Sequence, residues 1–263
     1  DFRYFTQRFL KRCKGVEKRR VRSITPQECS GYIEKAFDTP RQRYKARLIL
    51  SGVFSTAVKK GWCSSNPVTQ VDTPHVEENR VPILMPGEID TLMIAARSYR
   101  QGVCLAAVGM MLYAGIRPHE VSRLVWRHVD MEQQAIYISP QHSKTGGARR
   151  VTVHKPLLRI LRECEGAADA PVCPAGWLKH WRELRRQAGW GKTHPWPQDT
   201  LRHTFASYHL QCFRSFEVLQ CELGHRDAAL LRTRYLDMRG VVNAPAFWEV
   251  KKQIPLVETR GSM

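Results

Sequence analysis

The stretch GVCLAAVGMMLYAGIRPHEV, residues 102–121, changes abruptly from apolar to charged. Its apolar run ends at Gly115, and glycine is the residue most often found just beyond the C-terminus of a helix. We therefore expect a helix that stops there. Arg117 follows this helix end, and Glu120 lies about one helical turn further on. An arginine in such a place is usually a solvated surface residue, so its meaning depends on the rest of the chain.

A segment rich in proline and polar residues separates this region from the first third of the chain. The stretch CSSNPVTQVDTPHVEENRVPILMPGE, residues 63–88, interrupts helix-like sequence, so we place a linker near residues 70–83. The sequence therefore predicts two domains, residues 1–75 and residues 76–263, each long enough to bury a core.

The first domain is predicted to be helical. The motif TPQE at residues 25–28 predicts a capping box, and TP at residues 39–40 predicts a second helix start, with that helix stopping at Gly61. In the second helix the expected apolar stripe consists of Ile49, Leu50, Val53, Phe54, Ala57 and Val58.

The same helix carries a group of four basic residues that are candidates for contacts with phosphates. Arg43 and Arg47 are four residues apart and share a face, and Arg41 and Lys45 lie beside them. For any one of these residues, a solvated basic face is an equally good interpretation.

The second domain combines helices with two short strands. Strand-like alternation occurs in QAIYISP and in RRVTVH, and the intervening QHSKTGGA supplies a Gly-Gly turn signal for a hairpin. Helix-like sequence occupies residues 85–98, 155–164, 177–189, 199–212 and 215–224. The fold class predicted is mainly α with a small antiparallel β-sheet (α+β).

The composition favours a folded protein that binds nucleic acid. Lys and Arg number 42 against 24 Asp and Glu, a net charge of +18, and residues 1–75 alone hold 16 against 6. Such a field attracts polyanions, so double-stranded DNA is the leading partner. No segment resembles a signal peptide or a membrane span, which leads us to expect a cytoplasmic protein. The eight cysteines include no C-x-x-C pair, so we expect free thiols and no metal site.

Four motifs of the second domain contain residues whose side chains could take part in catalysis, and a tyrosine follows the last of them. AGIRPHEV holds Arg117, SKTGG holds Lys144, DTLRHTFAS holds Arg202, and LGHRD holds His225 ten residues before Tyr235. Each is ordinary alone, and Tyr235 could equally be a half-buried aromatic on a surface helix.

In this order and in these contexts the five residues resemble the tyrosine recombinase (phage integrase) family. The resemblance covers nearly the whole chain, and the basic helical first domain is similar to the family's core-binding domain. It implies a site-specific DNA recombinase, or integrase, of a bacterial or phage mobile element. The implied reaction passes through a 3′-phosphotyrosyl intermediate and a Holliday junction, with a homotetramer on two DNA sites. No cofactor or metal is implied, and the need for accessory DNA-bending proteins is left open.

The resemblance gives each residue a role that fits its chemistry. Arg117 and Arg202 would present planar guanidinium groups to the phosphate, and His225 would hydrogen-bond it in the transition state. Lys144 would supply a proton to the leaving 5′ oxygen, and Tyr235 would be the nucleophile.

Asp199 departs from the family pattern, because histidine is common at this position. We expect Asp199 to cap the helix that follows it, and it is only a tentative member of the catalytic set. The proton of Tyr235 could pass to Asp199 itself, to His194 or His203, or to water.

Two other functions share features with this one, and the C-terminal tail carries its own alternatives. A type IB topoisomerase would share the nucleophile without strand exchange, and a DNA-binding protein with a decayed site would share only the affinity. NAPAFWEVKKQIPLV predicts a short helix whose Phe247, Trp248 and Ile254 either reach a partner protomer or pack on their own domain.

Overall fold

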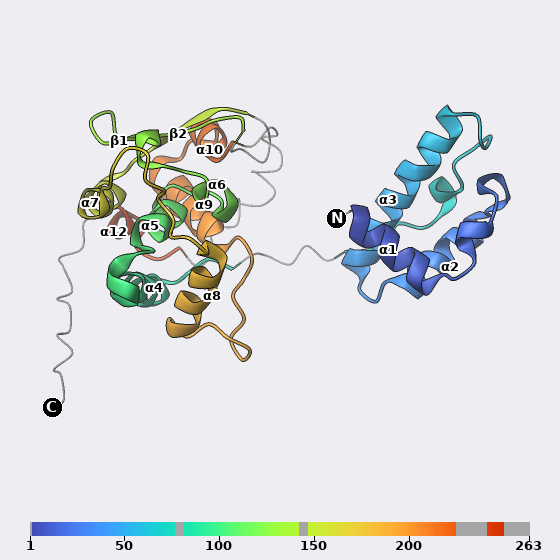
Figure 1. Ribbon diagram of the computed structural model, residues 1–263, viewed down its shortest axis with the longest axis horizontal. Coiled ribbons are helices and arrows are strands. Elements are labelled where there is room, and N and C mark those ends of the chain that lie inside the picture. The colour runs from blue at the N-terminus through green and yellow to red at the C-terminus, as the bar shows by residue number, and fades with distance from the viewer. Residues whose placement is uncertain (1, 77–81, 142–146, 225–240, 250–263) are drawn as a thin grey trace. The chain divides into compact units, whose positions relative to one another are not determined.

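The computed structural model describes residues 2–76, 82–141, 147–224 and 241–249 of the chain. The chain forms two compact units, Asp1–Asn79 and Arg80–Met263 (Figure 1). The division falls inside the linker region that the sequence indicates.

The first unit is built from three α-helices joined by short 3-10 turns. The helices are α1 (Phe2–Arg12), α2 (Pro26–Ala36) and α3 (Pro40–Lys59), and the turns are Val16–Lys18, Val21–Ser23 and Pro67–Gln70. The predicted caps are present: Thr25 Oγ1 accepts a hydrogen bond from Glu28 N, and Thr39 Oγ1 accepts one from Gln42 N. Each cap satisfies a backbone N–H that a helix start leaves unpaired.

The predicted apolar stripe of α3 is only partly covered. Phe54 and Ala57 are buried, and Ile49 and Leu50 pack against the core at its edge. Val53, by contrast, is 43% exposed. A unit this small covers a narrow strip of its longest helix, so a residue at the flank of the stripe stays in water.

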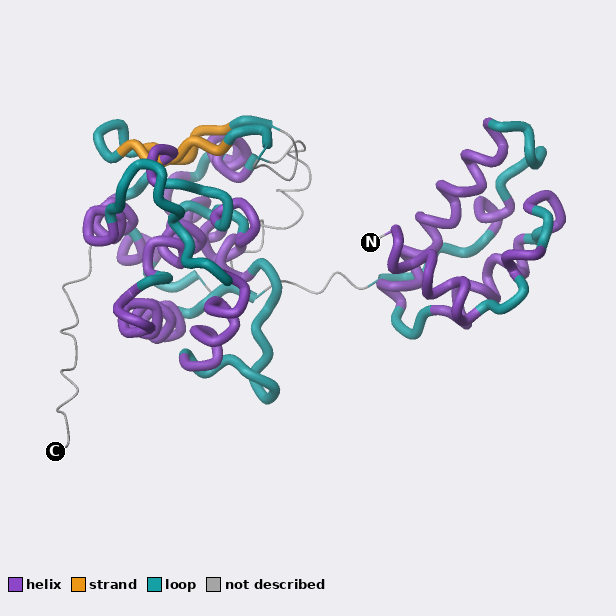
Figure 2. The backbone as a smooth tube through the Cα atoms, viewed as in Figure 1, coloured by secondary structure: helices purple, strands orange, loops and turns teal. Residues whose placement is uncertain are grey.

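The second unit is mainly helical, with a small sheet on one side (Figure 2). Its helices are α4 (Pro86–Ser98), α5 (Leu105–Tyr113), α6 (Pro118–Val121), α7 (Lys155–Cys164), α8 (Trp177–Gln187), α9 (Thr200–Phe213), α10 (Phe216–Leu223) and α12 (Ala244–Phe247). Among the described helices none combines the length and apolar character needed to cross a membrane. All eight cysteines are free thiols, as expected.

Helix α5 lies at the centre of the second unit's core. Every residue from Leu105 to Tyr113 is buried, and the helix packs against α4, α7 and α9. Gly109 allows the close approach of α7, because a Cβ there would lie 3.2 Å from Leu157 Cδ1. A helix that is apolar on all sides is usually buried in the core.

The sheet has three antiparallel strands in the order β1-β2-β3: β1 (Val129–Asp130), β2 (Ala135–Ile138) and β3 (Arg149–Thr152). Strands β2 and β3, the two strands that the alternating pattern predicts, pair antiparallel with Ile138 opposite Arg149. Strand β1 has only two residues, so no alternating pattern in the sequence could predict it. The predicted fold class, mainly α with a small antiparallel sheet, is confirmed.

The short C-terminal helix α12 packs on its own unit. Phe247 is buried and stacks on Tyr208 of α9, with ring centroids 4.4 Å apart, and also contacts Tyr113 of α5. For Phe247 and Trp248 the structure therefore supports packing on their own domain. Ile254 lies outside the described residues.

The helix end predicted at Gly115 is a tightly constrained point of the core. Gly115 adopts a φ of 61°, and a Cβ at this position would lie 2.6 Å from Phe205 Cδ1 and 2.8 Å from Leu223 Cδ2. Two helices, α9 and α10, thus converge on a turn that only glycine fits without strain.

Gly115→Ala should therefore lower the free energy of unfolding by roughly 2–4 kcal/mol, from left-handed backbone strain and overpacking together. Urea denaturation followed by tryptophan fluorescence measures it, because six of the seven tryptophans lie after residue 80. Gly87→Ala is the control, since a Cβ there would meet nothing within 4 Å and its φ is not positive. Equal stability of the two variants would contradict the constraint at Gly115.

Candidate active site

Three of the six predicted catalytic residues fall within the described part of the chain. Arg117, Asp199 and Arg202 are described, whereas Lys144, His225 and Tyr235 lie outside the described residues. The geometry of the site is therefore built from the first three and from their neighbours.

Arg117 occupies the N-cap position of α6, directly after the constrained turn at Gly115. Glu120 in the first turn of that helix reaches back to it. The backbone N–H of Arg117 donates to Glu120 Oε2 over 3.1 Å, and Arg117 Nη1 donates to Glu120 Oε1 over 3.2 Å. The arginine side chain is 16% exposed, so its guanidinium is held at the surface of the core.

Arg202, on α9, is buried and joins two helix ends. Its Nη1 donates to the carbonyl of Gly115 over 2.7 Å, and its Nη2 donates to the carbonyl of Leu223, the last residue of α10. Arg117 comes two residues after the first of these carbonyls, and His225 comes two residues after the second. Arg202 thereby fixes the starting points of both segments that carry predicted catalytic residues.

Arg149 joins Arg117 and Arg202 in a cluster of three arginines. The sequence analysis did not identify it as a site residue. Its side chain is 5% exposed; Nη1 and Nη2 donate to the Glu120 carboxylate over 3.1 and 2.6 Å, and Nε donates to the carbonyl of Glu222 over 2.8 Å. The strand pattern RRVTVH contains two adjacent arginines, and its alternation is the signal that separates them. Arg149 shares a face of β3 with the buried Val151, whereas the exposed Arg150 lies on the opposite face.

The carboxylate of Glu120 is the one acidic partner in this arrangement among the described residues, and it is fully buried. Burial acts to raise the pKa of Glu120, but hydrogen bonds and charge from Arg149, and then from Arg117, outweigh it and hold that pKa at about 2. Glu120 is therefore ionised at neutral pH. Two guanidinium groups on one carboxylate, with Arg202 held at the same turn by backbone carbonyls, leave a surplus of positive charge where an anion could bind.

Asp199 occupies the N-cap position of α9, but its side chain makes no cap hydrogen bond. The expectation of a side-chain cap is therefore wrong, and its reason is the backbone: Asp199 has a φ of 60°, whereas a capping residue normally has an extended conformation. Its carbonyl does take part, as the acceptor for His203 N over 3.0 Å. The exposed carboxylate is thus not committed to the helix end.

The four basic residues predicted to contact DNA on α3 do not form one equivalent face. Arg43 Nε donates to the carbonyl of Phe37 and Arg47 Nε to that of Val71, each over 2.9 Å, and both side chains are half-buried. Arg41 and Lys45 are exposed. Arg43 and Arg47 therefore help to hold the first unit together, and Arg41 and Lys45 are the better placed candidates for phosphate contacts.

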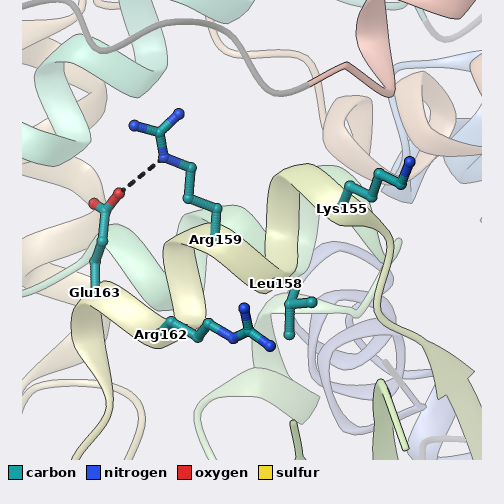
Figure 3. A pocket seen from close by; sticks show the side chains of 5 residues that line it. All are labelled: Lys155, Leu158, Arg159, Arg162 and Glu163. Atoms are coloured by element: carbon teal, nitrogen blue, oxygen red, sulfur yellow. Dashed lines mark ion pairs between the residues drawn. The ribbon is translucent and has the colours of Figure 1, made fainter. Parts of the chain in front are cut away.

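A shallow pocket lies on α7 of the second unit (Figure 3). Lys155, Leu158, Arg159, Arg162 and Glu163 line it, and Arg159 pairs with Glu163. No described member of the predicted catalytic set lines this pocket, so it does not mark the site.

Comparisons with known proteins agree with the arrangement. Residues 83–239 match the model of the phage integrase family. The integrase of Salmonella phage P22 is 23% identical over 199 residues, which cover 68% of this chain and 49% of the relative. The chain thus spans about half the length of the curated relative that it matches.

Solved structures share the fold. A lambda integrase dimer bound to a COC′ core site matches with a TM-score of 0.67 at 18% identity, over 86% of this chain and 88% of that one. The Tn1549 transposon integrase in complex with a circular intermediate DNA matches with a TM-score of 0.67 at 16% identity, over 88% and 94%. A lambda integrase tetramer bound to a Holliday junction matches with a TM-score of 0.64 at 18% identity, over 84% and 70%.

The family model covers more than half of the chain, including the turn that carries Arg117 and the helix that carries Arg202. This chain belongs to the phage integrase family.

Proposed function

We propose that this protein is a site-specific DNA recombinase that cleaves and rejoins strands through a 3′-phosphotyrosyl intermediate on Tyr235. The observation that carries the proposal is the placement of Arg117 and Arg202 at one turn, where Arg202 holds the carbonyl of Gly115. Arginines fixed in this way, one by a buried carboxylate and one by backbone carbonyls, are suited to bind a phosphodiester.

The two arginines would act on the scissile phosphate by stabilising charge that builds on its nonbridging oxygens. Glu120 orients Arg117, and the two carbonyl acceptors fix the plane of the Arg202 guanidinium. Such groups need little reorganisation during the reaction, which is the basis of electrostatic catalysis. His225 would add a hydrogen bond to the same phosphate.

The covalent steps are assigned by family resemblance. The phenol oxygen of Tyr235 would attack phosphorus and lose its proton, while the bond from phosphorus to the 5′ oxygen breaks and Lys144 protonates that oxygen. The 3′ phosphate would remain on the tyrosine until another 5′ hydroxyl displaces it. The exposed Asp199, with His194, His203 or water, is a candidate acceptor of the phenol proton.

The partners that we propose are double-stranded DNA and further copies of this chain. The net charge of +18 favours DNA, and the similar lambda integrase structures contain a dimer on a core site and a tetramer on a Holliday junction. We infer a homotetramer on two DNA sites, which acts on phage or bacterial DNA in the cytoplasm. Accessory DNA-bending proteins are compatible with this assembly.

Strand transfer between two labelled duplexes tests the proposal against its rivals. A recombinase joins a strand of one duplex to the other, whereas a type IB topoisomerase reseals within one duplex. A DNA-binding protein with a decayed site forms no covalent adduct. Resealing without transfer, or binding without an adduct, would overturn the proposal.

Tyr235→Phe should abolish the covalent protein–DNA adduct and leave DNA affinity unchanged, because only the attacking oxygen is lost. Trapping on a nicked suicide substrate, followed by mapping of the linked peptide, measures this. Tyr137→Phe is the matched control, since Tyr137 is 40% exposed and its hydroxyl bonds to Gln133. An adduct that survives in Tyr235→Phe refutes the nucleophile.

Arg117→Ala and Arg202→Lys should each slow single-turnover cleavage by roughly 10²-fold or more, about 2.7 kcal/mol, by analogy with the loss of one oxyanion donor. Arg202→Lys keeps the charge and loses the planar fork, so it tests geometry rather than charge. Thermal melting of each variant separates this effect from misfolding. Arg127→Ala, an exposed arginine paired with Asp169, is the control. Cleavage rates within a few-fold of wild type in folded variants would exclude the proposed stabilisation of the scissile phosphate by these two arginines.

In the first unit, Arg41→Ala combined with Lys45→Ala should weaken binding to all duplexes. The slope of log K against log salt should fall by about one unit for each phosphate that the protein no longer neutralises. Arg43→Ala combined with Arg47→Ala should instead lower the melting temperature, because two side-chain hydrogen bonds to backbone carbonyls disappear. An unchanged salt slope in the first pair would show that this face does not meet DNA.

A further inference from the structure

A cluster of three metal-binding side chains lies next to the arginine cluster and has no part in the proposed reaction. His154 precedes α7 just after β3, His209 lies on α9, and Glu222 lies on α10. Each presents one possible ligand atom, and the three atoms lie within 4.8 Å of one another. Three separate elements of the fold thus bring two imidazoles and a carboxylate to one point.

The cluster is buried and its hydrogen bonding is incomplete. His209 is 1% exposed and Glu222 is 5% exposed. Within the described part of the chain, His154 Nε2, His209 Nδ1 and Glu222 Oε2 have no hydrogen-bond partner. His209 Nε2 and Glu222 Oε2 face each other at 3.6 Å, beyond hydrogen-bond distance. Buried polar atoms left unsatisfied are destabilising, and each of the three clustered residues contributes one, so the cluster would gain from a ligand.

The protonation states suit coordination. Burial lowers the pKa of His154 to about 4, and burial together with the charge of His154 lowers the pKa of His209 to about 4. Both imidazoles are therefore neutral at pH 7 and can ligate without first losing a proton. Burial raises the pKa of Glu222, which is the effect expected for a carboxylate that lies in the core.

We propose that His154, His209 and Glu222 form a structural site for one divalent transition-metal ion of the zinc type. Two histidines and a glutamate are a known zinc ligand set, completed by a water molecule. Tetrahedral ligands about 2.1 Å from a common ion lie about 3.4 Å apart, so side-chain shifts totalling roughly 1 to 1.5 Å would close a site whose ligand atoms lie within 4.8 Å of one another.

The surroundings of the cluster favour a structural ion over a reactive one. The ring of His154 stacks on Phe213 and lies against Trp248, with centroids 5.2 and 4.5 Å away, and the ring of His209 packs on Phe213 at 4.7 Å. These aromatic side chains fix the orientation of both imidazoles. The ion would join the end of β3 to α9 and α10, and so brace α10 beside the carbonyl of Glu222 that Arg149 binds.

Zinc binding by the untagged full-length chain tests the site. After removal of metals with a chelator, Zn²⁺ is added and followed by calorimetry and by the melting temperature. We expect one high-affinity zinc per chain and a rise in melting temperature that grows with free zinc. His154→Phe keeps the stacked ring and Glu222→Gln keeps the size and shape of the side chain, so both should fold. Each should weaken zinc affinity at least tenfold, since even partners outside the first coordination shell contribute that much.

A matched control and a spectroscopic readout locate the ion. His75→Gln removes an exposed histidine of the first unit and should leave zinc binding unchanged. Co²⁺ bound to the wild-type chain should show d–d absorption without a thiolate charge-transfer band, which excludes the eight free cysteines as ligands. Absence of high-affinity zinc, a thiolate band, or unchanged affinity in both variants would each overturn the site. A thiolate band in the wild-type spectrum, or absence of high-affinity zinc in the wild-type chain, overturns the site even if a variant fails to fold.

Discussion

The buried carboxylate of Glu120 is the constraint on which the candidate active site depends. It accepts hydrogen bonds from Arg117 and Arg149, and its own desolvation is tolerable only because both cations are present. Removing either arginine would leave a charge without its partner in the core. The carboxylate therefore couples the orientation of an arginine at the turn to that of an arginine on the sheet, although 29 residues separate Glu120 from Arg149.

Arg202 extends this coupling to the two helix ends that converge on Gly115. The absence of a Cβ at Gly115 lets Phe205 and Leu223 approach the turn, and Arg202 then binds the carbonyls of Gly115 and Leu223. Backbone carbonyls at helix ends lack partners within the helix, so a buried guanidinium that satisfies two of them stabilises both ends. The same hydrogen bonds fix the plane of the group proposed to bind phosphate.

Local patterns in the sequence predicted much of the fold, because caps, apolar runs and strand alternation are local signals. The helix starts at Thr25 and Thr39 and the paired strands β2 and β3 follow from such patterns. The role of Arg149 depends on a strand register and on a partner far away in the chain, which no local pattern contains. The side-chain cap expected of Asp199 failed because its backbone is left-handed, a feature that the residue type allows but does not require.

The balance of charge explains why such a site would be preorganised rather than formed on binding. Arg117 and Arg149 share the carboxylate of Glu120, and Arg202 binds the carbonyls of Gly115 and Leu223 at the same turn, so three like charges repel one another there. Hydrogen bonds to Glu120 and to the backbone hold the guanidinium groups close together in spite of that repulsion. A phosphodiester would add the missing negative charge and relieve it. Under the proposed function, the fold itself therefore supplies the energy that brings these cations together, and the bound phosphate meets an arrangement that is already in place.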